Sequence, residues 1–541
     1  MHKLAIIADP HYHEVFAGYR FSGVTFNGRE GAAIRTWADT AASTRIFNES
    51  RLALLAALDT CVAEGIRTIL IAGDLSDDGQ VASMDAALAL LTRYESEHGI
   101  RFFLTPGNHD VYGMSGRHHT KAFYDGDGNI TAITSDPGPG QEAVFDPTMF
   151  CRSYTDIATL WAPFGIQRRV EDFYWECPFG AGDDFASRMF DMTSPDGSIT
   201  HRQLDLSYLV EPEPGLWIVS IDANVFEPRN GHSDNTRSDA FLDSTDAGWN
   251  ALVRLKPFIL DWLKSVSHRA REQGKTLVCF SHYPVLDTYD DTLENEQRLL
   301  GATQAVRRTP SAETAFAVAQ TGIGMHFSGH LHVSDTNTAT VGGNALTNVA
   351  IPSPVAFPPA FAVLNTGEGR YQIDYRLLNP AGFDAFFPFY SREDPDGHWT
   401  GQQSYGDFLY RHLRELVVNR YLPCEWPSDL ANALQSLSVS ALIDIAKSHD
   451  PIDPRTVRAQ AGDGGPTGID LVTDWYAARK ASALVFHYVS GARMMLYRQL
   501  MDTYALGAWS DPNCLQARIK LFLEMMARYL DEECIVRGAA E

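Results

Sequence analysis

The sequence predicts an α/β protein that continues into a helical C-terminal region, and two observations carry this prediction. Short apolar runs rich in β-forming residues alternate with stretches of helical periodicity over about the first two-thirds of the 541 residues. Beyond residue 400 the periodicity is helical only, and Leu515, Ile519, Phe522 and Met526 share one helix face. Alternation of strands and helices is typical of a layered sheet that is covered on both faces.

Six short apolar runs are predicted strands, and two stretches of helical periodicity connect the first three. The predicted strands are Leu4–Ala8, Thr68–Ala72, Phe102–Thr105, Trp217–Ile221, Leu277–Ser281 and Gly324–Ser328. The predicted helices are Ser50–Glu64 and Ala82–His98. A further β-rich part, Ala339–Ile351 followed by Ala360–Leu378, predicts hairpins that complete a second sheet.

A segment rich in Pro, Gly and aromatic residues follows residue 380 and predicts a boundary between two domains. We expect a catalytic domain at 1–380, with an insertion at about 111–214, and a helical C-terminal domain at 400–541. The insertion is rich in aromatic residues, and together with Asn224–Asp246 it is expected to form the walls of a pocket.

Composition and charge bear on the partners and the compartment. The formal charge of −24 disfavours nucleic acid, because polyanions are bound largely by Lys and Arg. No apolar run approaches the roughly 18 residues of a membrane helix, and the first apolar run is too short for a signal peptide. The seven cysteines form no CxxC pair, which argues against a zinc ribbon or a disulfide framework. We therefore expect a cytoplasmic protein without a membrane span.

Polar residues follow five of the predicted strands, at the point where each strand ends. They are Asp9, His11, Asp74, Asn108, His109, Asp110, His282, His330 and His332. In open α/β sheets, ligands bind outside the carboxyl ends of the strands. Carboxylate, amide and imidazole groups without thiolates suit Zn, Mn or Fe, and a carboxylate such as that of Asp74 can bridge two ions. The sequence therefore predicts a metal centre at the edge of the sheet where these strands end.

Three glycines precede these polar residues, namely Gly73, Gly107 and Gly329. We expect them to let the backbone turn sharply at a strand end and to bring the next side chain close to the ions.

The order of these motifs, D-x-H, G-D-x-x-D, G-N-H-D, a single His and G-H-x-H, resembles the calcineurin-like metallophosphoesterase family over residues 1–365. The resemblance implies a four-layered α/β/β/α sandwich with two metal ions, Mn, Zn or Fe. The ligands that it implies are Asp9, His11 and His332 for the first metal, Asn108, His282 and His330 for the second, and Asp74 as the bridge. It also implies that His109 contacts the substrate phosphate and assists the leaving group, that Asp110 orients His109, and that Asp77 shapes its loop.

The implied reaction is hydrolysis of a small-molecule phosphate ester by attack of a metal-bridging hydroxide. A phosphodiester is favoured, because His11 in the D-x-H motif resembles the phosphodiesterase branch. A phosphomonoesterase or nucleotidase with the same site is an alternative. A non-catalytic scaffold of the same fold is a second one, although every ligand-type position is present. All expected ligands precede residue 333, so the helical domain is expected to be dispensable for metal binding and to serve stability, substrate choice or a homo-oligomer.

Overall fold

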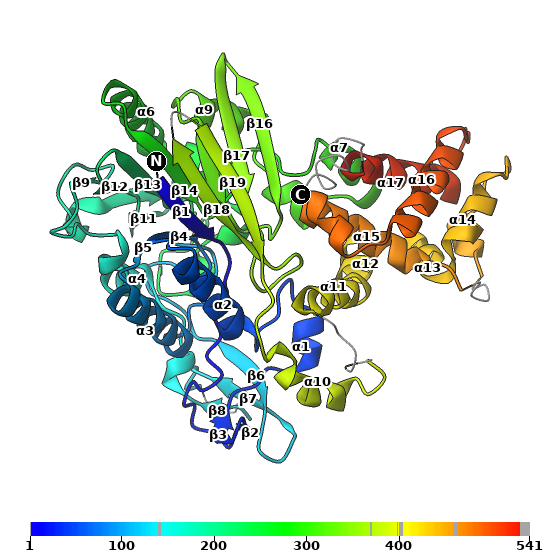
Figure 1. Ribbon diagram of the computed structural model, residues 1–541, viewed down its shortest axis with the longest axis horizontal. Coiled ribbons are helices and arrows are strands. Elements are labelled where there is room, and N and C mark those ends of the chain that lie inside the picture. The colour runs from blue at the N-terminus through cyan, green and yellow to red at the C-terminus, as the bar shows by residue number, and fades with distance from the viewer. Residues whose placement is uncertain are drawn as a thin grey trace.

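The computed structural model describes residues 2–138, 142–367, 370–397, 399, 404–458 and 464–530. Figure 1 shows a β-rich part, drawn from blue to yellow-green, and a helical part, drawn from yellow to red, beside it. Within the described ranges no helix combines enough length with enough apolarity to span a lipid bilayer.

Two sheets pack face to face in the β-rich part. The five-stranded sheet has the order β19 (Arg370–Leu377), β18 (Ala360–Gly367), β1 (His2–Ile7), β4 (Thr68–Ala72), β5 (Arg101–Thr105). The seven-stranded sheet has the order β16 (Asp335–Val341), β17 (Asn344–Ala350), β15 (Met325–Ser328), β14 (Thr276–Ser281), β13 (Leu216–Ile221), β12 (Tyr208–Glu213), β9 (Tyr174–Glu176). The sheets touch where Thr105 Oγ1 donates to the Ile221 carbonyl at 3.0 Å.

Strand β13 shows why the central strands are apolar along their whole length. Its residues alternate between two buried clusters: Ile218 packs in the cluster between the sheets, whereas Trp217 and Val219 pack in the cluster beneath the outer helices. A strand that is covered on both faces has no solvent-facing positions, so the periodic alternation of a half-exposed strand is missing.

Helices cover both outer faces. The first sheet carries α2 (Ser50–Ala63) and α3 (Val81–His98), and the second carries α5 (Gly248–Leu255), α6 (Pro257–Glu272) and α9 (Ala312–Ala319). The prediction of a four-layered α/β/β/α sandwich is therefore confirmed, and both helices expected from periodicity are present.

One expectation about the sheets was wrong. The hairpin of β18 and β19 does not extend the second sheet, because β18 pairs with β1 of the first sheet in antiparallel register. The expected insertion also supplies the edge strand β9 of the second sheet and its neighbour β12. The rest of it forms a small sheet, β6 (Thr120–Tyr124), β7 (Ile130–Thr134) and β8 (Val144–Phe145), and a hairpin, β10 (Met189–Thr193) and β11 (Thr200–Leu204). Apolar patterning shows that a strand is buried but not which sheet it joins.

The helical part shares a hydrophobic core with the N-terminal segment. Its elements are α11 (Tyr405–Leu416), a π-helical turn (Val417–Tyr421), α12 (Leu422–Glu425), α13 (Ser428–Ser436), α14 (Val439–Ala446), α15 (Gly468–Ala481), α16 (Gly491–Ala505) and α17 (Leu515–Tyr529). Trp37 and Ile46 lie in one buried cluster with Phe408 of α11. Because this core crosses the expected boundary, the division into two domains stays a prediction.

The apolar face of α17 is covered by this chain itself. Leu515, Ile519, Phe522 and Met526 are all fully buried in the core of the helical part. The homo-oligomer that was expected through C-terminal helices therefore stays a prediction, and it would have to use another surface than this face.

A buried carboxyl group lies at the junction of the two parts. Glu49 precedes α2 and is fully buried, and its Oε1 accepts a hydrogen bond from the Tyr390 hydroxyl at 2.8 Å. Its Oε2 has no hydrogen-bond partner among the described residues. Burial raises the pKa of Glu49 from 4.5 to about 8, so the folded chain holds this carboxyl mainly protonated at neutral pH.

We expect the substitution Glu49→Gln to remove a pH dependence of stability. Since the pKa of Glu49 is raised in the folded chain, the contribution of Glu49 to the free energy of unfolding is fully present below pH 4.5. This contribution is lost as the pH rises through about 8. Glutamine does not titrate. The free energy of unfolding of the variant should therefore rise relative to that of the wild type by up to a few kcal/mol across this window. Urea unfolding at three pH values within the window measures it. Equal pH profiles for the two proteins would contradict the assignment.

Candidate metal centre

The expected ligands follow strands of both sheets, and five of them have a left-handed backbone. Asp9 and His11 follow β1, Asp74 follows β4, Asn108 follows β5, His282 follows β14, and His330 and His332 follow β15. The five with positive φ are Asp9 (52°), His11 (42°), Asp74 (50°), His330 (70°) and His332 (53°), out of nine such non-glycine residues in the described chain. Each such conformation costs about 1–2 kcal/mol and typically persists at functional sites.

The three glycines make room for the ligands of neighbouring strands. A Cβ on Gly73 would collide with the His282 ring, one on Gly107 with the Asp74 carboxylate, and one on Gly329 with Asp9. Of the three glycines only Gly73 has a positive φ, of 84°. The expected close approach therefore applies to all three, and the expected conformational role only to Gly73.

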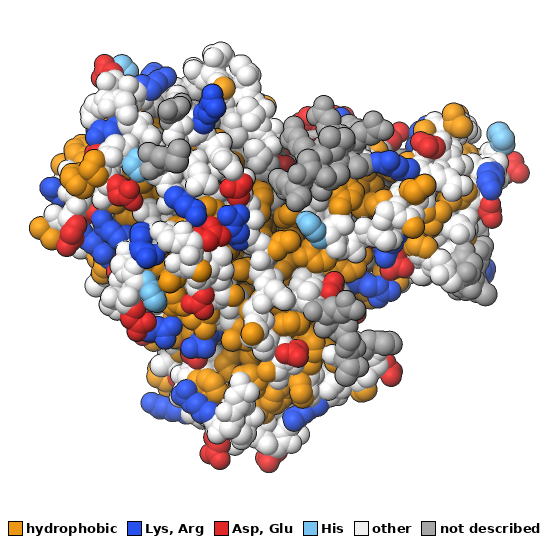
Figure 2. Space-filling view, in the orientation of Figure 1, with side chains coloured by type: hydrophobic (Ala, Val, Ile, Leu, Met, Phe, Trp, Pro, Cys, Tyr) orange, Lys and Arg blue, Asp and Glu red, His pale blue; other side chains and the backbone are white. Residues whose placement is uncertain are grey.

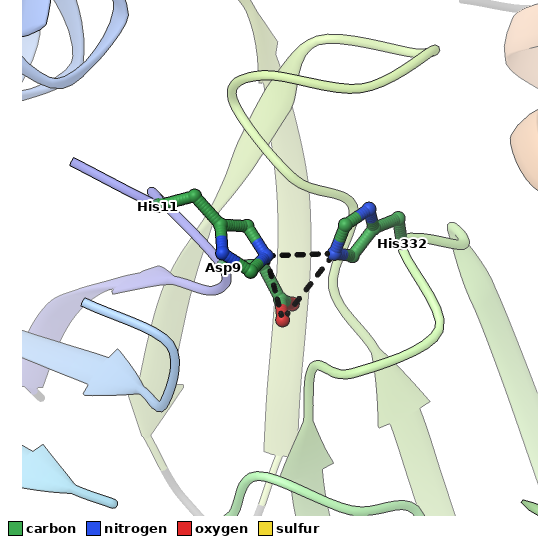
Figure 3. Close-up of side chains that lie close together, drawn as sticks. All are labelled: Asp9, His11 and His332. Carbon is green, nitrogen blue, oxygen red and sulfur yellow. Dashed lines mark hydrogen bonds and ion pairs between the residues drawn. The ribbon is translucent and has the colours of Figure 1, made fainter. Parts of the chain in front are cut away.

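Asp9, His11 and His332 form one group of converging side chains. Figure 3 shows the two imidazole rings turned toward each other beside the carboxylate. The Nε2 atoms of His11 and His332 lie 3.1 Å apart, and they lie 4.0 Å and 3.6 Å from Asp9 Oδ1. All three residues are buried.

Asn108, His282, His330 and Asp74 form a second group. His282 Nε2 lies 3.1 Å from Asn108 Oδ1, 3.2 Å from His330 Nδ1 and 3.4 Å from Asp74 Oδ2. The same Asp74 oxygen lies 3.7 Å from His11 Nε2, so Asp74 stands between the groups. His282 Nδ1 donates to the Ala72 carbonyl at 3.0 Å, which orients Nε2 toward these neighbours. Burial opposes protonation of this ring, but the Asp74 carboxylate raises the pKa of His282 to about 9. The structure thus brings all seven expected ligands together.

The chemistry of this set fits two cations. Burial lowers the pKa of His11, His330 and His332, so these rings are neutral and offer lone pairs. His11 Nδ1, His330 Nε2 and His332 Nδ1 are buried without a hydrogen-bond partner among the described residues. Two imidazole nitrogens that are each about 2.0–2.1 Å from one ion lie about 3.0–3.4 Å apart. The nitrogen pairs at 3.1 and 3.2 Å match this spacing.

His109 stands beside the ligand groups and is oriented by Asp78. Its ring centroid lies 5.1 Å from that of His11, and its backbone N–H donates to Asp74 Oδ1 at 2.8 Å. Its Nδ1 lies 2.6 Å from Asp78 Oδ1. Burial opposes ionisation of Asp78, but Lys121 and His109 hold the pKa of that carboxyl well below its usual range. The Asp78 carboxylate therefore keeps its negative charge beside Nδ1 of His109.

The orienting role expected for Asp110 is not what its contacts show. Its carboxylate accepts hydrogen bonds from the backbone N–H groups of Ser76 and Gly107, both at 3.0 Å. Burial and the neighbouring Asp74 raise the pKa of Asp110 to about 7. It ties together the two loops that carry Asp74 and Asn108, and the carboxylate next to the His109 ring is that of Asp78.

The Asp77 and Asp78 carboxylates share a set of buried cations. Asp77 is bonded by Arg35, Arg45 and Lys121, in agreement with the loop-shaping role expected for it. Lys121 comes from β6 and also pairs with Asp78 at 2.6 Å. The small sheet of the insertion therefore braces the loop that orients His109.

We expect Asp78→Asn to lower turnover about tenfold to hundredfold and to leave the metal content unchanged. Asparagine lacks the charge that stabilises a protonated His109 and can stabilise the wrong tautomer. Activity assays and elemental analysis measure the two effects. Asp261→Asn, at an exposed position of α6, is the matched control. Loss of metal in Asp78→Asn, or full activity, would contradict the orienting role.

A cavity of about 400 Å³ adjoins His109. Asp78, Asn108 and His109 form one side of it, and its walls come from residues 112–117 and 226–245. These are the start of the insertion and the segment Asn224–Asp246, both expected from their composition. The Arg117 guanidinium lies 3.3 Å from the centre of the Tyr112 ring. Within the described ranges no carboxylate lies within 4.0 Å of it, so the cavity contains an unpaired cation.

The helical part contacts the loop that carries His330 and His332, two of the expected metal ligands (the metal-ligand loop). The backbone N–H of Ser334 donates to the Lys480 carbonyl at 2.7 Å, and the Ser482 hydroxyl donates to the Ser334 carbonyl at 2.6 Å. Lys480 belongs to α15, and Ser334 lies two residues after His332. The expectation that residues beyond 400 are dispensable for the metal ligands is therefore not supported, because α15 holds this loop in place.

Residues 2–166 match the family model of the calcineurin-like phosphoesterases. The resemblance to this family is therefore confirmed. The matched segment contains Asp9, His11, Asp74, Asn108 and His109, whereas the three later histidines of the candidate site lie beyond it. Figure 2 shows basic side chains interspersed with acidic ones, and no continuous basic stripe crosses the described part of this face.

Two solved structures are similar to this chain. A dimetal phosphatase from Danio rerio is 14% identical, with a TM-score of 0.37, and the match covers 70% of this chain and 96% of that chain. The phosphopantetheinyl hydrolase from Mycobacterium tuberculosis is 13% identical, with a TM-score of 0.25, and the match covers 65% of this chain and 90% of that chain. These values are too low to bear on the substrate. No curated protein matches the sequence.

Proposed function

We propose that this chain hydrolyses phosphate esters with two metal ions and that phosphodiesters are its preferred substrates. The observation that carries the proposal is the convergence of seven ligand-type side chains, from the ends of strands in both sheets, into two groups between which Asp74 stands. The presence of His109 beside these groups supports hydrolysis rather than a purely structural metal site.

Each group of side chains would hold one ion. Asp9, His11 and His332 would hold the first and Asn108, His282 and His330 the second, with Asp74 in contact with both. When bound, the two cations would neutralise the phosphate oxygens and activate a water for attack on phosphorus. The ions are expected to be Mn, Zn or Fe, because the set contains no thiolate.

His109 is the group that would hold and deliver a proton. Asp78 accepts the hydrogen bond from Nδ1, so Nε2 is the atom that is free to donate to the leaving oxygen. Asp78 stabilises the protonated ring before the transfer. The backbone N–H of His109 donates to Asp74, which couples the position of the ring to the proposed bridging carboxylate.

The cavity beside His109 would accommodate the leaving group of the ester. Its volume of about 400 Å³ accommodates an organic substituent much larger than water. Phe226 and Phe241 offer apolar surface in it, and the unpaired Arg117 offers a charge for an anionic or hydrogen-bonding substituent. A sizeable leaving group is common to phosphodiesters and to nucleotide-like monoesters, so the diester preference rests on the D-x-H motif in addition.

A comparison of esters on protein reconstituted separately with Mn, Zn and Fe tests the proposal. We expect faster hydrolysis of a bis(nitrophenyl) phosphate diester than of the nitrophenyl monoester under the same conditions. A faster monoester reaction would support the phosphomonoesterase alternative. Two bound ions without hydrolysis of any ester in a broad panel would support the non-catalytic scaffold.

A further inference from the structure

A second cavity lies between the metal-ligand loop and the helical part. Its volume is about 70 Å³, and it is lined by His330–Val333 on one side. α8 (Gln304–Arg308), the π-helical turn and α15 form the other sides. It shares no lining residue with the cavity beside His109. A substrate at the metal centre would therefore meet two separate spaces.

Three cations and the carboxylates of Glu296 and Glu425 line this cavity. The pairing of the three cations differs. Arg479 is paired with Glu296 at 2.9 Å and Arg308 with Asp246 at 2.8 Å. Lys480 has no carboxylate within 4.0 Å among the described residues. Its Nζ donates to the Leu331 carbonyl at 3.4 Å, although an ammonium group has three N–H donors to satisfy.

Burial of the unpaired ammonium group of Lys480 destabilises the folded chain. The residue is 8% exposed, and an isolated buried ammonium costs several kcal/mol. The position of Lys480 at the C-terminal end of α15 offsets part of the cost. An anion bound in the cavity would offset a larger part of the cost of burying Lys480.

We propose that this cavity is an oxyanion subsite in which Lys480 binds a phosphate group of the substrate or product. The proposal rests on the proposed function for the source of the phosphate. The cavity has room for about one phosphate-sized group or two waters but not for a nucleoside. Because His330 and His332 line it as well, the bound group is adjacent to the ligand set and is not the leaving group beside His109.

The subsite would make the helical part a contributor to substrate choice. Its cation comes from α15, whereas its other wall is the ligand loop itself. Esters with a second anionic group on the retained side would gain from Lys480, and neutral retained groups would not. This dependence on charge is a property that a purely structural helical part lacks.

Equilibrium binding of inorganic phosphate to the metal-loaded protein tests the subsite without requiring turnover. We expect Lys480→Met to weaken phosphate binding about tenfold, since a hydrogen bond to a charged group is lost. The variant Lys480→Arg, which keeps the charge, should stay within about threefold of the wild type. The control Lys447→Met, an exposed lysine of the helical part that pairs with Asp444, should bind phosphate as the wild type does. Elemental analysis of each protein reports whether the metals are retained.

A second variant probes the cavity without touching Lys480 or any ligand. Ala305 of α8 is buried in the cavity wall, and Ala305→Leu should weaken phosphate binding by filling the space. If Lys480→Met retains its metals and binds phosphate as the wild type does, the proposal is wrong. If Lys480→Met loses its metals, Ala305→Leu decides: weakened binding supports the subsite, and unchanged binding overturns it. Lys480-dependent phosphate binding in a protein that hydrolyses no ester would overturn the proposed function alone.

Discussion

Asp74→Ala is expected to abolish phosphoester hydrolysis and to lower the metal content by more than one ion per chain. Asp74 Oδ2 lies 3.4 Å from His282 Nε2 and 3.7 Å from His11 Nε2, so one carboxylate serves both groups of ligands. Removing it takes an anionic ligand from each ion at once. It also removes the acceptor for the backbone N–H of His109. Elemental analysis and an activity assay on the same preparation measure both effects.

The control for this variant is Asp261→Ala, which removes a carboxylate from an exposed position on α6. It should keep the activity and metal content of the wild type. If Asp74→Ala held two ions as tightly as the wild type, Asp74 would not be the bridging ligand. Loss of only one ion would place Asp74 in a single group.

His109→Ala is expected to keep both metals and to lose about 10²–10⁴-fold in turnover with a poor leaving group. The His109 ring is not one of the expected metal ligands. It lies beside the two ligand groups, with Nδ1 hydrogen-bonded to Asp78. The loss should be much smaller with a nitrophenyl ester, because that leaving oxygen needs no proton. Rates for an alkyl and a nitrophenyl ester, compared in the variant and the wild type, measure the difference.

Equal losses with good and poor leaving groups would argue against proton delivery by His109 and leave it as a phosphate-binding residue. The Asp78→Asn variant offers an internal check. If Asp78 acts through His109, then combining it with His109→Ala should add little to the loss from His109→Ala alone.

The convergence of the expected ligands could be predicted from the sequence because each lies within four residues of the end of a short strand. A buried strand is visible as an apolar run, and the polar residue that ends it is visible beside it, as for Asp9 after β1 and Asp74 after β4. The glycines before the ligands were visible in the same way. Their physical role needed the structure, since the atoms that exclude a Cβ at Gly107 belong to another strand end.

The partner of His109 could not be predicted in this way. Asp110 is adjacent in sequence, but its side chain points to backbone N–H groups. Asp78 lies 31 residues earlier and reaches the ring through the loop after β4. Lys121, which braces Asp78, comes from a hairpin inside the insertion. No periodicity links these residues, so only their positions in three dimensions reveal the pairing.

The membership of the sheets and the role of the helical part were also beyond the sequence. The strands β9 and β12 lie in a segment whose composition predicted an insertion, yet they extend the second sheet. Helical periodicity after residue 400 was correct, but it does not show that Lys480 lies beside the loop of His332. Contacts between segments so far apart in sequence leave no local pattern.

The most direct test of the central claim is the number of metal ions bound per chain. The wild-type protein would be stripped with a chelator, reconstituted separately with Mn, Zn and Fe, freed of excess metal and analysed for its elements. Our account predicts two ions per chain with at least one of these metals, and phosphoester hydrolysis that appears only in the loaded protein. A chain that retains no ion, or a single one, with every metal would contradict the two-metal centre.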